Sequence, residues 1–398
     1  MIGRKAKWVG EDLQNLLTLS LEELKQKYPN IDNDKLRAER SYWKRKMEQE
    51  GKLYKTWETS AYDKKKQEWV TATNHGYIYE PDPETLAETF EPVEPAKITP
   101  TRRKRAERLG RQLLVFGDTQ IGYRRVYDSE GNDELIPTHS EEVLSVLSQI
   151  NAHERPDEII NLSDTIDLAE LSRFAPDSDN YHRTLSPSFR RVHSMYSQLR
   201  ADNPDARITE VDSNHTQRVH KAILKNMPAL YGLTLPGENY PLLSYYRLAN
   251  LESLGIDFIS GYGAAEYVYG DDNPIVFKHG THSSSTPGGT VRKEMSQNPE
   301  VNVVRGHGHS SEHVVRTNRD GDYLHYLQIG TTCATNGSLP SFGSAIDDFG
   351  RPVKSQENWQ NQLLMVTDYE GQYQFDVIDV VRGIGFYRGN RYDGNQND

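Results

Sequence analysis

The sequence predicts a mixed α/β (α+β) domain preceded by a small helical module. From residue 112 onward, short apolar runs alternate with segments of helical periodicity, and polar residues directly follow the apolar runs. This alternation is typical of a sheet with parallel strands, whose sites lie past the carboxyl ends of the strands. A shift in charge indicates a separate front part. Residues 1–111 hold 23 Lys and Arg against 19 Asp and Glu, a balance of +4, whereas the whole chain carries −11.

The composition narrows the class of protein. At 398 residues the chain is long enough for one large domain or two modest ones. No run of about 18 apolar residues occurs, so no membrane span is expected. The first residues lack the apolar stretch of a signal peptide. Cys333 is the only cysteine, which excludes an intrachain disulfide. We therefore expect a cytoplasmic protein.

The front segment, residues 1–79, is predicted to be a helical module. Ser20 and Glu23 form a capping-box pattern before an apolar run, and Pro29 ends that helix. A second helix, rich in Lys and Arg, is expected over 32–51. Two short helices joined by a tight turn resemble a helix-turn-helix, which makes DNA an expected partner. A plain helical bundle with solvated charges is the alternative.

A linker is expected at residues 80–111. Its first part, 80–96, is acidic and contains four prolines. Its last part, 101–111, reads TRRKRAERLGR and is strongly basic. That basic cluster is interpreted either as a solvated charge run or as a further contact for nucleic acid.

The main domain is expected over residues 112–385. Its strands are predicted at 113–118, 157–164, 206–215, 275–280 and 301–309, its helices at 142–150 and 189–199, and its hairpins at 313–329 and 362–380. Residues 216–275 carry mixed signals and several prolines, so we interpret them as an insertion or cap. Residues 386–398 are rich in Gly, Asn and Asp and are expected to form a disordered tail.

Five polar clusters follow the expected strands. They are Gly117-Asp118-Thr119-Gln120, Ser163-Asp164-Thr165-Ile166-Asp167, Ser213-Asn214-His215, Lys278-His279-Gly280 and Gly306-His307-Gly308-His309. Their carboxylate, carboxamide and imidazole groups suit Mn²⁺, Fe or Zn²⁺. They also suffice for two ions that share one carboxylate. Two ions about 3.5–4 Å apart can clamp a phosphoryl group and activate a water molecule.

The order of these clusters resembles the calcineurin-like metallophosphoesterase family. The family pattern is D-x-[H/Q], G-D-x-x-D, G-N-H-[D/E], H and G-H-x-H, and the five clusters follow it in order over roughly 112–335. The overall layout also resembles that of bacteriophage-encoded, nuclease-like phosphoesterases. The resemblance implies a β-sandwich with flanking helices and a dinuclear metal site at one edge.

The resemblance also implies roles for individual residues. The implied metal ligands are Asp118, Gln120, Asp164, Asn214, His279, His307 and His309. The first ion would take Asp118, Gln120 and His309, and the second Asn214, His279 and His307. Asp164 would bridge both ions and so belongs to the catalytic group. His215 would act as general acid or stabilise the transition state, and Asp167 would orient a ligand or a backbone group.

This sequence departs from the family pattern at four positions. Gln120 replaces the usual histidine with a neutral, weaker ligand. Ser163 and Ser213 replace glycines, which a small residue tolerates unless the backbone needs a positive φ. Thr216 stands where an acid often follows the histidine, so the expected orienting partner of His215 is missing.

The expected function is hydrolysis of phosphodiester bonds with two divalent ions, Mn²⁺ before Fe or Zn²⁺. A nuclease acting on DNA is the leading interpretation, because a basic front module can localise an acidic catalytic domain on a polyanion. A phosphomonoesterase or a small-nucleotide or cyclic-nucleotide phosphodiesterase is the second interpretation. A catalytically degenerate binding or scaffold module is the third.

Overall fold

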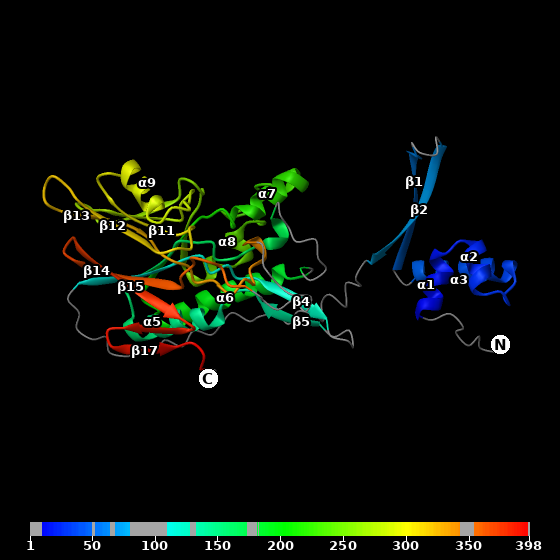
Figure 1. Cartoon of the computed structure of the whole chain (residues 1–398), viewed down its shortest axis with the longest axis horizontal. Helices are drawn as coiled ribbons and strands as arrows, with labels where there is room; N and C mark the ends of the chain where they lie inside the picture. The colour runs from blue at the N-terminus through cyan, green and yellow to red at the C-terminus, as the bar shows by residue number, and fades with distance from the viewer. Residues whose placement is uncertain are drawn as a thin grey trace. The chain divides into compact units, whose positions relative to one another are not determined.

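The computed structural model describes two compact units, Met1–Glu94 and Pro95–Asp398 (Figure 1). The residues described are 10–49, 52–63, 68–79, 110–127, 133–172, 181, 183–342 and 354–396. Most of the expected linker, 80–109, lies outside them. The first described strand of the larger unit begins at Arg111, two residues before the expected start at 113.

The smaller unit begins with three helices, α1 (Gly10–Thr18), α2 (Leu21–Lys27) and α3 (Asn33–Gln49). The expected capping box is confirmed at the start of α2. The Glu23 amide donates to Ser20 Oγ at 3.2 Å, and the Ser20 amide donates to Glu23 Oε2 at 2.8 Å. The helices pack around one buried cluster, formed by Leu16, Leu24 and Leu36.

The expectation that all of residues 1–79 are helical is wrong. After α3 the chain forms an antiparallel hairpin of β1 (Lys52–Asp63) and β2 (Glu68–Tyr79). Both strands are rich in Thr, Tyr, Trp and Val, whose β-branched and aromatic side chains favour strands.

The helices of the smaller unit are also joined by a side chain of α3. Arg40 donates from Nε to the Leu16 carbonyl of α1 at 2.7 Å.

The larger unit contains an eight-stranded sheet in the order β17-β16-β15-β14-β3-β6-β7-β8. Its strands are β17 (Asn390–Asp393), β16 (Ile384–Tyr387), β15 (Gln372–Val381), β14 (Gln362–Tyr369), β3 (Arg111–Phe116), β6 (Glu158–Asn161), β7 (Arg207–Val211) and β8 (Ile256–Ile259). The neighbours β3, β6, β7 and β8 run parallel, as expected for the first three. The remaining pairs are antiparallel.

A second sheet has five strands in the order β12-β13-β11-β10-β9. Its strands are β12 (Glu312–Thr317), β13 (Tyr323–Gln328), β11 (Asn302–Arg305), β10 (Ile275–Lys278) and β9 (Glu266–Tyr269). The expected hairpins are confirmed as the pairs β12–β13 and β14–β15. A further small hairpin, β4 (Tyr123–Tyr127) with β5 (Asp133–Pro137), was not expected.

Alternating side chains of the eight-stranded sheet fill two different cores. Leu113 and Val115 of β3 pack with Phe277 and Val304 of the other sheet. Leu114 and Phe116 of the same strand instead join the core that includes the helices α5 (Glu141–Glu154) and α6 (Leu185–Asp202). Helix α9 (Gly289–Gln297) covers the five-stranded sheet. Figure 1 shows these layers in order, and they agree with the implied sandwich.

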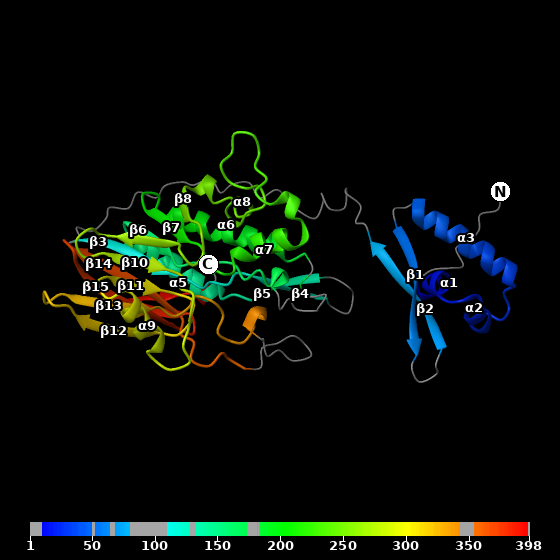
Figure 2. The ribbon, with the colours of Figure 1, turned by 90° about the horizontal axis from the view of Figure 1, so that it is seen from above.

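The insertion expected at 216–275 is only partly an insertion. Residues 217–254 form α7 (Gln217–Asn226), α8 (Tyr245–Leu248) and short turns, and Figures 1 and 2 both show α7 next to α8. The rest contributes β8 to one sheet and β9 to the other. Their runs, IDFI and EYVY, are too short and too mixed in polarity to stand out without their partners.

The prediction of a disordered tail at 386–398 is also wrong for the part of this segment that the structure describes. Residues 384–393 form the antiparallel pair β16–β17. Tyr387 and Tyr392 are buried, and the Tyr392 hydroxyl lies 3.1 Å from His153 Nδ1 of α5. These two aromatic side chains anchor a segment whose Gly and Asn content indicated disorder.

No described helix has the length and apolar composition that crossing a bilayer requires.

Candidate metal centre

The five polar clusters lie at one edge of the sandwich because each follows the carboxyl end of a strand. β3 leads to Asp118 and Gln120, β6 to Asp164, and β7 to Asn214 and His215. In the second sheet, β10 leads to His279, and β11 leads to His307 and His309. The face-to-face packing of the sheets brings these ends together, so side chains up to 191 residues apart in the sequence make contact.

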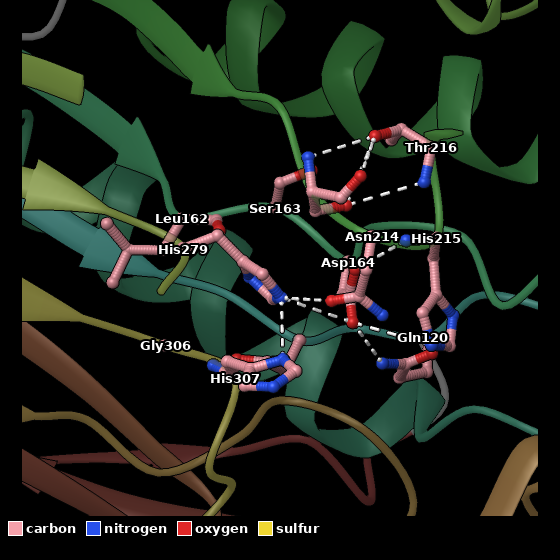
Figure 3. A network of polar contacts seen from close by, with 12 residues as sticks. Gln120, Leu162, Ser163, Asp164, Asn214, His215, Thr216, His279, Gly306 and His307 are labelled. Carbon is pink, nitrogen blue, oxygen red and sulfur yellow. Dashed lines mark hydrogen bonds and ion pairs between the residues drawn. The ribbon is translucent and has the colours of Figure 1, made fainter. Parts of the chain in front are cut away.

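Four of the expected ligands form what we call the histidine side of the centre. It consists of Asp164, Asn214, His279 and His307. His279 Nε2 lies 2.9 Å from Asn214 Oδ1, 3.1 Å from His307 Nδ1 and 3.4 Å from Asp164 Oδ2 (Figure 3). Donor atoms of Asp164, His279 and His307 all lie within 4.8 Å of one another. This convergence of one carboxylate and two imidazoles is the arrangement that a divalent cation needs.

The orientation of His279 is set by the backbone. Its Nδ1 lies 2.9 Å from the Leu162 carbonyl oxygen, which can only accept a hydrogen bond. Nδ1 therefore carries a proton, and Nε2 faces the other ligands. Metal-binding histidines are commonly held in this way, with one ring nitrogen donating to a carbonyl or carboxylate.

The other expected ligands form the glutamine side. It consists of Asp118, Gln120 and His309, with Asp164 shared between both sides. His309 Nε2 lies 3.1 Å from Asp118 Oδ1, and Gln120 Nε2 donates to Asp164 Oδ2 at 3.2 Å. Among the described residues, no hydrogen-bond donor reaches the buried Gln120 Oε1. A buried carbonyl oxygen without a donor is unusual, and a cation would satisfy it.

The charges of the centre favour a cation. Burial raises the pKa of Asp164, but His215 and His279 outweigh it and hold this pKa well below its ordinary value. Burial likewise opposes ionisation of Asp118, yet its pKa is lowered overall, chiefly by His309. Burial and the nearby His279 lower the pKa of His307 to about 4. Ionised carboxylates and an unprotonated imidazole are the forms that bind metals.

The backbone of the centre is strained. Six site residues that are not glycine have φ in the left-handed region. They are Asp118 (55°), Gln120 (51°), Ser163 (70°), Asp164 (47°), His307 (73°) and His309 (59°). Such conformations cost on the order of 1–3 kcal/mol each and cluster at functional sites. The strained turns directly after β3, β6 and β11 aim the ligand side chains inward.

Ser163 corrects one expectation. Serine was expected to be tolerated only without a positive φ, yet its φ is +70°. Two contacts hold it there. Its amide donates to Asn161 Oδ1 at 2.7 Å, and its hydroxyl donates to Glu210 Oε1 at 3.2 Å. Ser213, the other replacement of glycine, is not among the described positive-φ residues.

His215 has an orienting acid, although not from the next residue. The Thr216 hydroxyl lies 3.0 Å from the Ser213 amide, which donates to it, so Thr216 stabilises its own turn. Asp167 lies on the other side, with Oδ1 3.3 Å from His215 Nδ1. Asp167 was expected to orient a ligand or a backbone group, and in the structure its carboxylate lies beside His215.

Gly306 allows the two sheets to approach each other at the centre. A Cβ atom at this position would lie 2.6 Å from Asp118 Oδ2, closer than real Cβ contacts. The same carboxylate oxygen accepts the His307 amide at 2.9 Å. The glycine in the last cluster thus leaves room for a carboxylate from the other sheet.

Arg218 was not predicted from the sequence as a site residue. Its Nη2 lies 2.9 Å from His215 Nε2, and its Nη1 donates to Ser341 Oγ at 2.8 Å and lies 3.5 Å from Asp167 Oδ1. Its spacing offered a signal, because Arg218 follows His215 by only three residues. Arg218 lines a cleft of about 740 Å³ that opens on Asp164 and His307.

Comparisons with known proteins add little. No protein-family model and no curated protein matches the chain. A single mutant of Vps29 from Entamoeba histolytica is similar over 69% of this chain and 99% of that chain, with 12% identity and a TM-score of 0.30. A conserved uncharacterized protein from Streptococcus pneumoniae, described as a predicted phosphoesterase, covers 72% and 97%, with 11% identity and a TM-score of 0.28. Likenesses this weak carry no weight for function.

Proposed function

We propose that the chain is a dinuclear-metal-dependent phosphoesterase that hydrolyses phosphodiester bonds, and that its substrate is DNA. One observation carries the proposal. Ligand atoms of Asn214, His307 and Asp164 all lie 2.9–3.4 Å from one nitrogen, Nε2 of the buried His279. The order of the motifs in the sequence supports the same reaction class.

The residues present fit two divalent cations. Asp118, Gln120 and His309 would hold one ion, the three other ligands of the histidine side would hold the second, and Asp164 would be shared. Gln120 Oε1 is buried without a donor among the described residues, and a half-turn of the amide would bring it to a cation held beside Asp164. The mixed oxygen and nitrogen donors suit Mn²⁺ first, with Fe or Zn²⁺ as alternatives. When bound, such ions polarise a phosphoryl oxygen and make a nearby water more acidic.

His215 is proposed to donate a proton to the leaving oxygen. Its amide donates to Asp164 Oδ1 at 3.1 Å, which fixes the residue beside the shared carboxylate. Asp167 Oδ1 lies 3.3 Å from Nδ1, close enough for its charge to stabilise an imidazolium, and Nε2 is left to serve the cleft side. Arg218 Nη2 donates to Nε2 at 2.9 Å, and when Arg218 turns to a phosphate oxygen of the substrate, Nε2 is free to take up from solvent the proton that it gives to the leaving oxygen.

The proposal of DNA as substrate rests on the smaller unit. Lys35 and Arg37 are exposed on α3, the second helix of the helix-turn-helix-like pair. The side chains of residues 44–46, also basic, lie outside those described. A positive module offsets the repulsion between DNA and a catalytic unit with excess acidic residues.

Two other functions each have an observation in their favour. The cleft volume of about 740 Å³ is typical of small-molecule sites, which favours a small-nucleotide or cyclic-nucleotide phosphodiesterase or a phosphomonoesterase. Gln120 presents its amide nitrogen to Asp164, which favours a degenerate binding module that holds fewer ions.

Purified full-length protein with added Mn²⁺ tests the proposal. The substrates are a chromogenic phosphodiester, a phosphomonoester, a cyclic nucleotide and single- and double-stranded DNA. We expect the diester and DNA to be hydrolysed, with kcat lowered about 10²–10⁴-fold in His215→Ala. His313→Ala, an exposed histidine of β12, is the matched control and should be unaffected. Equal rates in His215→Ala and the control, or hydrolysis of the monoester alone, would overturn the proposal.

A further inference from the structure

Helix α7 carries a row of cations along the cleft. Arg218, Lys221 and Lys225 recur at intervals of three and four residues, which places them on one face of the helix. All three line the cleft that also contains Asp164 and His215. From Arg218 to Lys225 the helix rises roughly 10 Å, so the row is longer than a single phosphate group.

The opposite face of α7 sets the orientation of the basic row. Val219 and Ile223 are buried in the main core of the unit, next to the helices that cover the sheet. Because these two anchors set the rotation of the helix, the basic row faces outward over the cleft. Ala222 also lines the cleft and leaves space between Lys221 and Lys225.

The outer two cations have no protein partner in the part of the chain that is described. Lys221 and Lys225 are exposed, and no described carboxylate forms an ion pair with either. Among the described residues, the acids that line the cleft are Asp164, which belongs to the metal centre, and Glu170, whose Oε1 accepts a hydrogen bond from Thr184. Three cations beside the candidate metal centre, two of them without an ion pair among the described residues, favour a ligand with several negative charges.

We propose that Arg218, Lys221 and Lys225 bind backbone phosphates that flank the scissile phosphate, so that the substrate is a polynucleotide chain and not an isolated phosphate ester. The inference rests on the proposed phosphodiesterase function. It adds the path of the substrate, because the polynucleotide would leave the metal centre along α7. Arg218 contacts the phosphate nearest the centre, and Lys221 and Lys225 contact the next ones.

The double variant Lys221→Ala/Lys225→Ala tests the row in the full-length chain. The matched control is Arg292→Ala/Lys293→Ala, which removes the same charge from two exposed residues of α9. Hydrolysis of a twelve-nucleotide single-stranded DNA is compared with that of bis(p-nitrophenyl) phosphate, which has no flanking phosphate. Binding of the same labelled oligonucleotide is measured by fluorescence anisotropy without added metal, over a range of salt concentrations.

We expect kcat/KM for the oligonucleotide to fall at least about tenfold more than kcat/KM for the small diester in the α7 variant only. The slope of log affinity against log salt should become smaller by roughly 1.4, because two phosphate contacts to a single strand are lost. An equal fall for both substrates, or no difference from the control, would overturn the inference. If the wild type hydrolyses neither substrate, the proposed function fails instead. The binding data then test whether the basic row binds phosphates. Weaker oligonucleotide binding by the α7 variant supports this role, and unchanged binding overturns it.

Discussion

The two sides of the metal centre share Asp164 but are organised differently. On the histidine side, His279 Nε2 is surrounded at 2.9–3.4 Å by three other ligand atoms, and the Leu162 carbonyl sets its direction. On the glutamine side, Gln120 turns its amide nitrogen, not its oxygen, toward Asp164. The histidine side is therefore already arranged for a cation, whereas the glutamine side needs a rotation of one side-chain amide.

The difference follows from the chemistry of the two groups. A neutral imidazole that donates from one nitrogen must present a lone pair at the other. A carboxamide exchanges donor and acceptor by a half-turn about its last bond, so its neighbours decide which atom faces inward. We infer that the two ions bind with unequal affinity and that the histidine side fills first.

The largest expected effect comes from the residue that both sides share. Asp164→Asn replaces the shared carboxylate with a weaker neutral ligand, and both ions should be lost or weakened. The loss of several kcal/mol of charge stabilisation corresponds to about a thousandfold lower kcat/KM for a phosphodiester. Inductively coupled plasma mass spectrometry on the same samples counts the bound ions. Two ions per chain in the variant would contradict a shared role.

Substitutions of ligands that belong to one side only should distinguish the two bound ions. His279→Ala should lower kcat/KM about a hundredfold and abolish binding of the tighter ion, whereas Gln120→Ala should affect only the weaker ion, about tenfold. Gln120→His, which supplies the usual histidine, should raise affinity on the glutamine side. Metal titrations of the three variants measure this. Identical loss of both ions in His279→Ala and Gln120→Ala would show that the sides are not independent.

Glu210 supports the turn that carries Asp164. We expect its ionisation to change the free energy of unfolding. Burial raises the pKa of Glu210 to about 7, although Thr165, Tyr196, Tyr245 and Ser163 all donate to its carboxylate. Between its ordinary pKa and 7 the folded protein binds more protons than the unfolded chain, so stability falls as the pH rises through this window.

Urea denaturation at pH 5 and pH 8 measures this contribution. The wild type should lose on the order of 2 kcal/mol more than Glu210→Gln between these values, because glutamine does not titrate. The same pH dependence in both proteins would contradict the assignment to Glu210.

The smallest expected effect is the pH dependence of metal affinity on the histidine side. Burial lowers the pKa of His279, but Asp164 more than offsets this, and the pKa is raised overall. Below that pKa a cation must displace a proton, so affinity should rise by up to about tenfold per pH unit until the pH passes the raised pKa of His279. Calorimetry in two buffers of different ionisation enthalpy counts the protons released. His279→Asn should give a flatter profile, and an unchanged profile would exclude His279 as the titrating ligand.

Much of the centre could be predicted from the sequence because its ligands follow apolar runs directly. The runs before Asp118, Asp164 and Asn214 predicted parallel strands, and the carboxyl ends of such strands meet at one edge. The capping box of Ser20 and Glu23 was predicted equally well, since both partners lie within one turn.

Other features depended on partners that are distant along the chain. The short strands β8 and β9 and the β16–β17 pair are stabilised by neighbouring strands and by the α5 surface, which no local pattern reveals. Arg218 was missed because its importance comes from Asp167 and Ser341, which are 51 and 123 residues away.

The sequence by itself determined which donor groups follow which strands, because local alternation of apolar and polar residues fixes strand ends. Only the tertiary structure decided how these groups face one another: the inward direction of His279, the turned amide of Gln120, the pairing of Asp167 with His215 and the basic row along the cleft. The physical reason is that direction depends on backbone strain and on hydrogen bonds between residues that follow different strands, and both arise only when strands distant in the sequence come together.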